Sequence, residues 1–406
     1  MNDKLKARDA GDVEEAVRWA LAEGKALEVV GRGSKRALGR PAQWDGALDL
    51  SALSGVTLYE PEELVLSARA GTPLREIESL VDSRNQELAF EPMDHGPLLG
   101  GLPARGSIGG TLAVNLSGPR RIKAGAARDH FLGFAGVSGR GERFKSGGRV
   151  VKNVTGYDLC KLVAGSWGTL AAMTEVTIKV LPRAETEMTL VVLGLADRAA
   201  MTAMAAAMGS ACDVSGAAHL PARIAPRMVP GLARAATVLR IEGVEPSVIH
   251  RMRALAELMR THGELATLDR ERSVALWRAV RDVTPFAQQG PAGTYPVWRI
   301  STAPTQGAEL AAAIAQRIDA EFIYDWAGGL IWAVLAPAED AGEAVVRAAT
   351  ERCGGHATLI RAPAAIRAVV PVFTPEQGAL AALTARVKQS FDPQGVLNAG
   401  RMWAGV

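Results

Sequence analysis

The stretch that decides the fold runs over residues 152–181 and reads KNVTGYDLCKLVAGSWGTLAAMTEVTIKVL. Its middle predicts a helix over 157–164, because the apolar residues there share one side. A turn of small residues follows over 165–169, and apolar and polar side chains then alternate over 174–181. That period of two predicts a half-buried strand. Glycines so close to a strand let main-chain amides approach a ligand, since glycine has no Cβ.

The composition is that of a soluble globular protein with room for more than one domain. The 406 residues are 48% hydrophobic and 22% charged, and the net charge is only +3. A surplus this small favours neither nucleic acid nor an anionic membrane surface as a partner. The cysteines form no disulfide framework, no apolar run reaches membrane-spanning length, and the N-terminus lacks a signal-peptide core. We therefore expect a cytoplasmic protein.

Two further glycine-rich loops precede the stretch quoted first. The strand expected over 26–30 runs into Gly31-Arg32-Gly33-Ser34-Lys35, where successive amides and the Ser34 hydroxyl can bind an anion. A tight turn that needs only positive φ explains the same residues equally well. The loop lacks both the third glycine of a dinucleotide fingerprint and the spacing of a P-loop. Residues 100–118 lead into a small-residue helix, whose N-terminus can face a phosphate or pack closely on a strand.

Basic residues are frequent between 120 and 152, beginning with Arg120 and Arg121. Such a spread is most simply a solvated face, and the alternatives are a docking surface formed by these residues or a charge near a cofactor. Within it we expect a hairpin, with strands over 131–137 and 142–145.

After Pro182, helices and strands alternate in a way that predicts an α+β domain. The last six elements, over 297–361, follow the order strand, helix, strand, strand, helix, strand of a ferredoxin-like fold. The elements over 188–282 look like a less regular version of it, and helices are expected on one face of an antiparallel sheet. A helix over 375–390 and an apolar tail follow, and we expect the tail to pack back on the body.

Four motifs stand in the order found in FAD-linked oxidases of the vanillyl-alcohol-oxidase and p-cresol-methylhydroxylase type, and the chain resembles that family. They are GRGSK, SIGGTLAVNLSG, TGYDLCKLVAGSWGTLAAMTEVTIKVLP and FDPQGVLNAGR. Together they cover roughly the first 185 residues and the last 30. The stretches LYEPEELVLSARAGTPLREIESLV and LAFEPMD are most similar to the FAD-binding accessory subunits of bacterial glycolate oxidases.

The resemblance implies an FAD-dependent oxidoreductase with an α+β architecture, in which two subdomains hold FAD and a cap domain covers the isoalloxazine ring. It divides the chain into an FAD-binding domain over 1–185, a ferredoxin-like cap over 186–365, and a C-terminal helix and tail over 366–406. The tail would return to the FAD-binding domain.

The motifs also imply which residues hold the cofactor. The first glycine loop would cradle the pyrophosphate, the second would line another part of the cofactor, and Val176 and Asn398 would lie near the flavin. Carried across, the cofactor-binding residues are Gly31, Arg32, Gly33, Ser34, Lys35, Ser107, Ile108, Gly109, Gly110, Asn115, Ser117, Tyr157, Asp158, Gly165, Gly168, Thr169, Leu170, Val176 and Asn398. Neither loop offers the histidine or cysteine through which other members attach flavin, so FAD is expected to be non-covalent.

The chain also departs from the catalytic relatives. Trp167 stands where they often have glutamate, and the six histidines form no paired motif for the metal that relatives oxidising 2-hydroxy acids carry in the cap. The resemblance therefore implies no metal, and it assigns no catalytic residue.

Three hypotheses follow. The first is the FAD-binding subunit of a glycolate oxidase complex, with a homologous catalytic flavoprotein subunit and an iron–sulfur subunit as partners and peripheral membrane association through that complex. The second is a free-standing dehydrogenase of a small 2-hydroxy acid, with His95 or Tyr324 as the base and Arg299 or Arg361 for the carboxylate. The third is an assembly protein without cofactor, which the retained glycine loops rank last.

Overall fold

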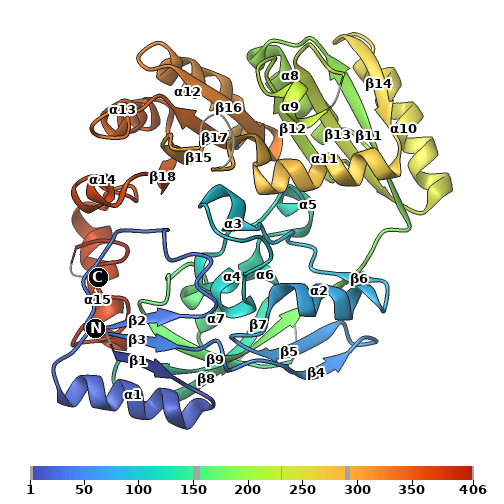
Figure 1. The fold of residues 1–406 in the computed structure, drawn as a ribbon. Helices are drawn as coiled ribbons and strands as arrows, with labels where there is room; N and C mark the ends of the chain where they lie inside the picture. Colours follow the sequence, from blue (N-terminus) through green and yellow to red (C-terminus); the bar gives the residue numbers. More distant parts are fainter. Residues whose placement is uncertain (1–2, 150–155, 230, 289–292, 405–406) are drawn as a thin grey trace.

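The structure, a computed structural model, describes residues 3–149, 156–229, 231–288 and 293–404. Residues 152–155 of the stretch quoted first lie outside the described residues. Figure 1 shows an N-terminal domain below, a large sheet with its helices above, and the C-terminal segment returning along one side to end beside the N-terminus. No helix in the described ranges combines the length and the apolar character that crossing a membrane requires.

The N-terminal domain is built on two sheets. The smaller is parallel, with the order β1-β3-β2, and α1 packs on it. The larger is antiparallel, with the order β4-β5-β9-β7-β8. The elements of the two sheets are β1 (Asp3–Lys6), α1 (Ala10–Ala22), β2 (Leu27–Val30), β3 (Gly46–Asp49), β4 (Val56–Glu60), β5 (Val65–Arg69), β7 (Phe131–Ser138), β8 (Arg143–Gly147) and β9 (Ala171–Lys179). The hairpin expected over 131–145 is confirmed as β7 and β8.

Short elements connect and cover these sheets. Gln86–Glu87 (β6) pairs antiparallel with Leu181–Pro182 (β10). The helices are α2 (Leu74–Asp82), α3 (His95–Leu98), α4 (Ile108–Val114), α5 (Arg121–Ala124), α6 (Ala127–His130) and α7 (Leu159–Val163).

Strand β9 lies in the middle of the larger sheet and begins at Ala171, three residues before the predicted start. The strand prediction is confirmed, but the strand is covered on both faces. Thr174 and Thr177 are buried, and each side chain is hydrogen-bonded, to the carbonyl of Ala135 and to the hydroxyl of Ser67. The alternation therefore reflects hydrogen-bonded threonines and not exposure to solvent.

The upper part, which we call the cap domain, is one eight-stranded sheet with the order β14-β11-β13-β12-β16-β17-β15-β18. Its strands are β11 (Thr186–Leu193), β12 (Gly216–Leu220), β13 (Ala236–Gly243), β14 (Glu264–Leu268), β15 (Val297–Ser301), β16 (Ala320–Asp325), β17 (Leu330–Leu335) and β18 (His356–Arg361). Its helices are α8 (Asp197–Met208), α9 (Ala225–Met228), α10 (Glu245–Met259), α11 (Arg270–Asp282), α12 (Gly307–Ala315) and α13 (Glu343–Cys353). Single 3₁₀ turns lie at Thr284–Phe286, Pro304–Gln306 and Trp326–Gly328.

Both halves of the cap sheet have the ferredoxin-like strand order, which confirms the prediction for the second half and corrects it for the first. The strand that sequence analysis missed is β14, a five-residue strand at the edge of the sheet that shows no regular alternation of exposed and buried side chains. The halves join where β12 pairs with β16. Figure 1 shows α11 on the side of the sheet that faces the N-terminal domain.

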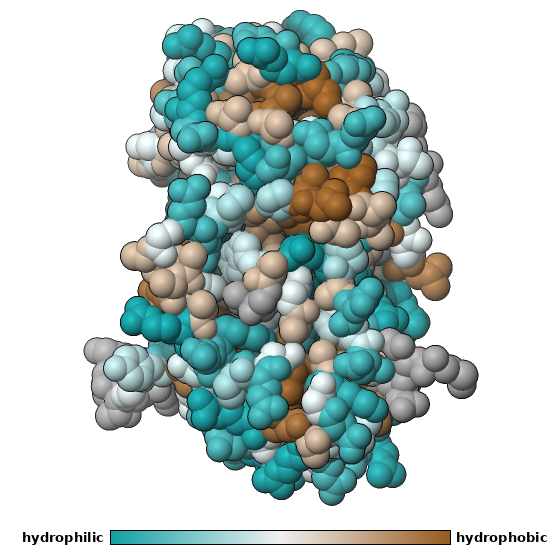
Figure 2. Space-filling view, turned by 90° about the vertical axis from the view of Figure 1, so that its left-hand side faces the viewer, coloured by the Kyte–Doolittle hydropathy of each residue, from teal (hydrophilic) through white to brown (hydrophobic). Residues whose placement is uncertain are grey.

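The C-terminal segment comprises α14 (Ala364–Val369), α15 (Gly378–Phe391) and a tail that returns to the N-terminal domain, as expected. The tail inserts Val396 and Leu397 into the core between α1 and the smaller sheet. Helix α15 itself buries little apolar surface and leaves Leu380 and Leu383 exposed. Figure 2, which faces this side of the molecule, shows scattered hydrophobic patches among hydrophilic ones.

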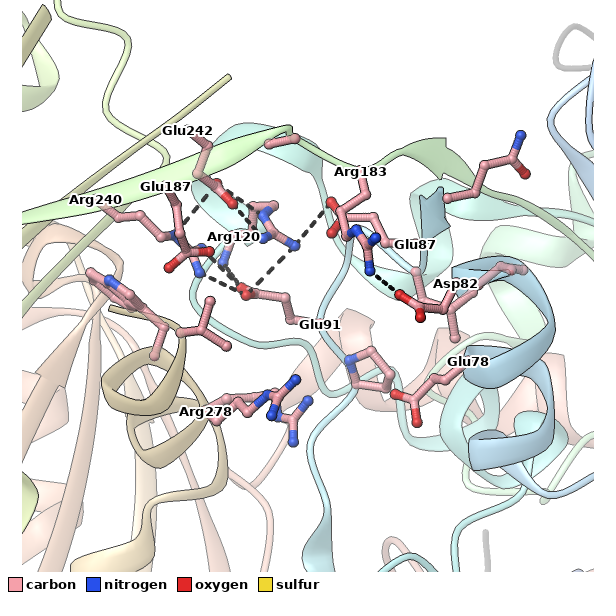
Figure 3. A pocket seen from close by; sticks show the side chains of 18 of the residues that line it. Glu78, Asp82, Glu87, Glu91, Arg120, Arg183, Glu187, Arg240, Glu242 and Arg278 are labelled. Atoms are coloured by element: carbon pink, nitrogen blue, oxygen red, sulfur yellow. Dashed lines mark hydrogen bonds and ion pairs between the residues drawn. The ribbon is translucent and has the colours of Figure 1, made fainter. Parts of the chain in front are cut away.

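A network of buried ion pairs joins the two domains beside a cavity of about 610 Å³. Arg240 of the cap pairs with Glu91 of the N-terminal domain at 2.8 Å, and Arg120 pairs with Glu242 of the cap at 2.5 Å. Figure 3 shows these four side chains meeting at one side of the cavity, while Arg183 pairs with Asp82 on the other side. Arg120 is thus buried between carboxylates, and it cannot contribute to the docking surface that the sequence offered as an alternative for residues 120–152.

The tail depends on one buried lysine of α15. The ammonium group of Lys388 donates hydrogen bonds to the carbonyls of Thr169 and Leu397 and to the carboxylate of Asp392, at 2.7, 3.0 and 2.7 Å. We expect Lys388→Met to lower the free energy of unfolding by about 3 kcal/mol, since it leaves these buried acceptors without their cation. Urea denaturation measures the change, with Arg386→Met on the exposed side of α15 as control. A loss equal to that of the control would contradict the prediction.

Glu87, at the same interdomain network, should make stability depend on pH. Burial raises the pKa of its carboxyl from 4.5 to about 7, against the opposing charge of Arg120. Between these values the folded protein keeps a proton that the unfolded chain releases, so stability falls as pH rises through this window. We expect the melting temperature to fall less for Glu87→Gln than for the wild type between about pH 5 and pH 8. Thermal unfolding at the two pH values tests this, and Glu76→Gln, exposed on α2, should behave as the wild type.

Candidate functional site

The first glycine loop and the N-terminus of α4 face each other across a narrow cavity of about 70 Å³. A Cβ at Gly31 would meet the hydroxyl oxygen of Ser107 at 2.6 Å, so only glycine allows the two segments to lie this close. Ser107 also caps α4, because its side chain accepts a hydrogen bond from the amide of Gly110. The result is a cradle of main-chain amides and one hydroxyl.

Positive charge in this cradle is not fully balanced by carboxylates. Burial lowers the pKa of Lys35 to about 8, and Asp94 opposes that shift. The only hydrogen bond of its ammonium group to a described residue is a long one of 3.5 Å to Ser34. Likewise, Nε of Arg32 is buried without a partner among the described residues. Buried donors are normally satisfied, so Lys35 and Arg32 fit an anionic ligand such as a pyrophosphate.

The other two cations of the cavity have structural partners. Arg36 forms a two-pronged contact with the carboxylate of Glu28, with Nε to Oε1 at 2.9 Å. Arg401, from the tail, donates to the carbonyl of Lys35 at 2.9 Å and so fixes the end of the glycine loop. Burial lowers the pKa of Arg401 to about 10, and Glu28 opposes that shift.

Asn398 locks the glycine turn at 165–169 against β2. Its side-chain oxygen accepts a hydrogen bond from the amide of Val29, and its side-chain nitrogen donates to the carbonyl of Trp167, both at 2.8 Å. A Cβ at Gly168, where φ is +75°, would meet that nitrogen at 2.7 Å. The Asn398 amide is therefore occupied in holding backbone, although the residue lines the cavity.

Only part of the predicted cofactor set meets at this cavity. The predicted residues that do line the cavity are Gly31, Arg32, Gly33, Ser34, Lys35, Ser107, Gly110 and Asn398. Most of the other predicted residues support the structure around the cavity. Ile108 and Gly109 face the core, and the side chains of Asn115 and Ser117 accept hydrogen bonds from the first amides of α6. Asp158 caps α7, and the turn at 165–169 contains Gly165, Gly168 and Thr169. Leu170 and Val176 are buried, and Tyr157 is 90% exposed.

Val176 and Tyr157, which were expected to contact the cofactor, lie farthest from that expectation. Val176 is fully buried and points from β9 into the core of the larger sheet, where its apolar side chain is removed from water. Tyr157 precedes α7 and lies on the surface. Neither residue lines the cavity.

Sequence reasoning missed several residues that line the cavity. They are Glu28, Val29, Val30, Arg36, Ala113, Val114, Trp167 and Arg401. Ala113 was detectable, since it lies three residues after Gly110 on the same helix and hence on the same face. Sequence analysis noted Trp167 only as a departure from the relatives. In the structure Trp167 lines the cavity, its backbone has a positive φ of 58°, and its ring packs on that of Phe373.

A second group of basic side chains leads from this cavity toward the cap. His95 is buried, and its Nδ1 lies 3.1 Å from the carbonyl of Met93, which assigns the proton to Nδ1. Its Nε2 then carries a lone pair and has no partner among the described residues. Burial, with the charges of Lys35 and Arg299, holds the pKa of His95 well below its usual range. His95 is therefore neutral, and the charges of both Lys35 and Arg299 favour that neutral form.

Two other candidates for the second hypothesis have structural roles. Tyr324 donates a hydrogen bond of 2.5 Å to Asp197, on the helix-covered side of the cap. Arg361 donates to the carbonyls of Tyr295, Leu98 and Phe286, and so holds main chain where cap and N-terminal domain meet. These contacts leave His95 and Arg299 as the candidates that face the junction of the two domains.

Comparison with known proteins relates this geometry to one family. A family model described as an FAD binding domain matches residues 5–147. The glycolate oxidase subunit GlcE of Escherichia coli K12 is 33% identical over 392 residues, which cover 96% of each chain. A D-2-hydroxyglutarate dehydrogenase of Xanthomonas citri is 34% identical over 173 residues, 41% of this chain and 34% of that protein.

Solved structures share the fold at low identity. The structure of p-cresol methylhydroxylase with bound substrate superposes with a TM-score of 0.70 at 12% identity, over 98% of this chain and 88% of that one. An alkyldihydroxyacetonephosphate synthase superposes with a TM-score of 0.69 at 15% identity, over 97% and 75% of the two chains. These similarities confirm the expected fold. The near full-length match to GlcE goes further, and the chain belongs to the family of FAD-linked oxidoreductases that includes this glycolate oxidase subunit.

Proposed function

We propose that this chain is the FAD-binding subunit of a glycolate oxidase complex and supports the oxidation of glycolate to glyoxylate. The observation that carries the cofactor part is the glycine cradle, where the half-buried Lys35 and Arg32 have no hydrogen-bonded carboxylate among the described residues. The substrate is inferred from the full-length relative, whose name is that of a glycolate oxidase subunit. The partners we propose are a homologous catalytic flavoprotein subunit and an iron–sulfur subunit, in a cytoplasmic complex.

The residues of the cavity would hold FAD without a covalent bond. Among the described residues that line it there is neither histidine nor cysteine, the side chains through which a flavin could be attached. Main-chain amides of residues 31–35, the Ser107 hydroxyl and the Lys35 ammonium would bind the pyrophosphate. The chemistry supplied by bound FAD is two-electron transfer. The chain itself would position the cofactor and exclude water with the C-terminal tail.

The domain limits follow from the same proposal. We place the FAD-binding domain at 1–185, the cap at 186–365 and the returning C-terminal segment at 366–406. The break near 185 coincides with the end of β10 and the start of β11, where the chain passes from one sheet to the next. An assembly protein without cofactor would gain nothing from these two cations, because withdrawing a charge from water without a hydrogen-bonded counter-ion destabilises a fold.

The absorption spectrum of the purified chain tests the proposal. We expect flavin bands that stay oxidised when glycolate is added without oxygen, and that bleach once the partner subunits are present. Bands that glycolate bleaches in the isolated chain would favour the free-standing dehydrogenase. A chain that has no flavin bands and takes up no FAD would contradict the proposal.

The glycine cradle gives a second prediction. Gly31→Ala places a Cβ 2.6 Å from the Ser107 oxygen, so the loop and α4 must move apart. We expect the dissociation constant for FAD to rise at least about tenfold, because the amides no longer converge on the phosphates. Fluorescence titration of the apoprotein with FAD measures it. The matched control is Gly148→Ala, whose Cβ meets nothing within 4 Å. Equal affinity in the two variants would argue against the cradle.

A further inference from the structure

Most of α15 lies outside the hydrophobic cores of the described chain. Its hydrogen bonds and its ring contact with other described segments all come from residues 388–391. There Lys388 forms its three hydrogen bonds, and the ring of Phe391 lies 6.0 Å from that of Phe144. None of the apolar residues over 378–387 belongs to a hydrophobic core of the described residues or packs against one. The last turn therefore anchors a helix whose first ten residues have no covering element.

The uncovered part of α15 is strongly apolar. Residues 378–387 read GALAALTARV, and Leu380 and Leu383 are 56% and 49% exposed. A helix this short is marginal in water, and it normally gains its stability by burying an apolar face. Figure 1 shows α14 on the same side of the molecule, and its last residue, Val369, is 79% exposed. Apolar residues exposed together on one side of a molecule are typical of a contact surface.

Exposed apolar residues elsewhere belong to helices that are covered on their other face. In α10, Ile249 and Leu258 are 38% and 39% exposed, but the opposite face of that helix is buried in the core of the cap. In α15 the only buried side chain is that of Lys388. The exposed leucines of α15 thus have no buried face behind them that stabilises the helix.

The sequence pattern of this uncovered face is complementary to itself. The midpoint of Leu380 and Leu383 falls between residues 381 and 382. Two charged residues stand at the ends of the face, and the midpoint of Glu376 and Arg386 falls on residue 381. Neither of the two forms an ion pair with another described residue. A two-fold contact requires such a pattern, because residue i of each copy meets residue j of the other.

We propose that α15 docks on α15 of a second copy of this chain, with the two helices antiparallel about a two-fold axis near residue 381. Leu380 of each copy then packs on Leu383 of the other, and Glu376 of each approaches Arg386 of the other. The residues around the axis are alanines, at 379, 381, 382 and 385, so the helices can approach closely. Antiparallel macrodipoles add a small attraction. No residue of 378–387 lines the cofactor cavity, so the proposal is independent of the proposed function.

Sedimentation equilibrium of the full chain as purified tests the dimer. Two helices of this length form a small interface, so we expect a dissociation constant between about 1 and 100 µM. Leu383→Glu should raise it at least about tenfold, because the contact then buries an unpaired charge. The matched control is Leu258→Glu on α10, which should dimerise as the wild type. Circular dichroism checks that both variants are folded.

Charge variants test the antiparallel arrangement. Glu376→Arg and Arg386→Glu should each weaken the dimer about tenfold at low salt, because symmetry places the like charges together twice. An equimolar mixture of the two variants should dimerise as the wild type does. In the mixed dimer one chain carries two basic residues and the other two acidic ones, so both contacts are attractive again.

Several outcomes would overturn the proposal. They are a wild type that stays monomeric up to about 100 µM, a folded Leu383→Glu that loses no more affinity than Leu258→Glu, or a mixture of charge variants no tighter than either alone. If Leu383→Glu does not fold, the charge variants decide, since Arg386 is exposed and Glu376 precedes the helix. A monomeric wild type that needs Leu383 to assemble with the proposed partner subunits would assign this face to a different chain.

Discussion

The buried ammonium group of Lys388 is the contact on which the cofactor side of the molecule depends. It joins the last helix, the tail and the glycine turn, through Asp392, Leu397 and Thr169. Each of its three donors has an acceptor, and this satisfies the condition for burying a lysine. Because the tail is held there, Asn398 can bridge β2 and the turn, and Arg401 can fix the end of the first glycine loop. The cradle is therefore assembled by residues from both ends of the chain.

The protein contains two kinds of buried or half-buried cation, those paired with carboxylates and those without a hydrogen-bonded carboxylate. Between the domains, Arg120 and Arg240 are matched with Glu91 and Glu242, and these ion pairs set how the cap sits on the N-terminal domain. In the cradle, Lys35 and Arg32 lack a hydrogen-bonded carboxylate among the described residues. The first arrangement stabilises a fixed geometry. The second raises the free energy of the ligand-free protein and lowers it when an anion binds.

The cap contains two ferredoxin-like units, and the sequence pattern predicted one of them clearly and the other only in part. The order of elements over 297–361 predicted one ferredoxin-like unit because each of its strands is apolar and well bounded. The matching unit before it was obscured by a single short edge strand, β14, whose sequence ELATL does not alternate apolar and polar residues. Once β14 is placed, the two units pair through β12 and β16 into one sheet. Pairing between strands so far apart in the chain leaves no trace in local sequence.

The sequence by itself determined the family, the two glycine loops, the central strand β9 and the return of the tail, because these depend on local period, on glycine and on motif order. Only the tertiary structure decided which side chains meet. It placed Val176 in the core and Tyr157 on the surface, away from the cavity, buried Arg120 in an interdomain ion pair and occupied Arg361 with main-chain carbonyls. Arg299 and Arg121, 178 positions apart, come together over one indole. Contacts of this kind depend on how sheets and domains pack, and neither composition nor spacing records that packing.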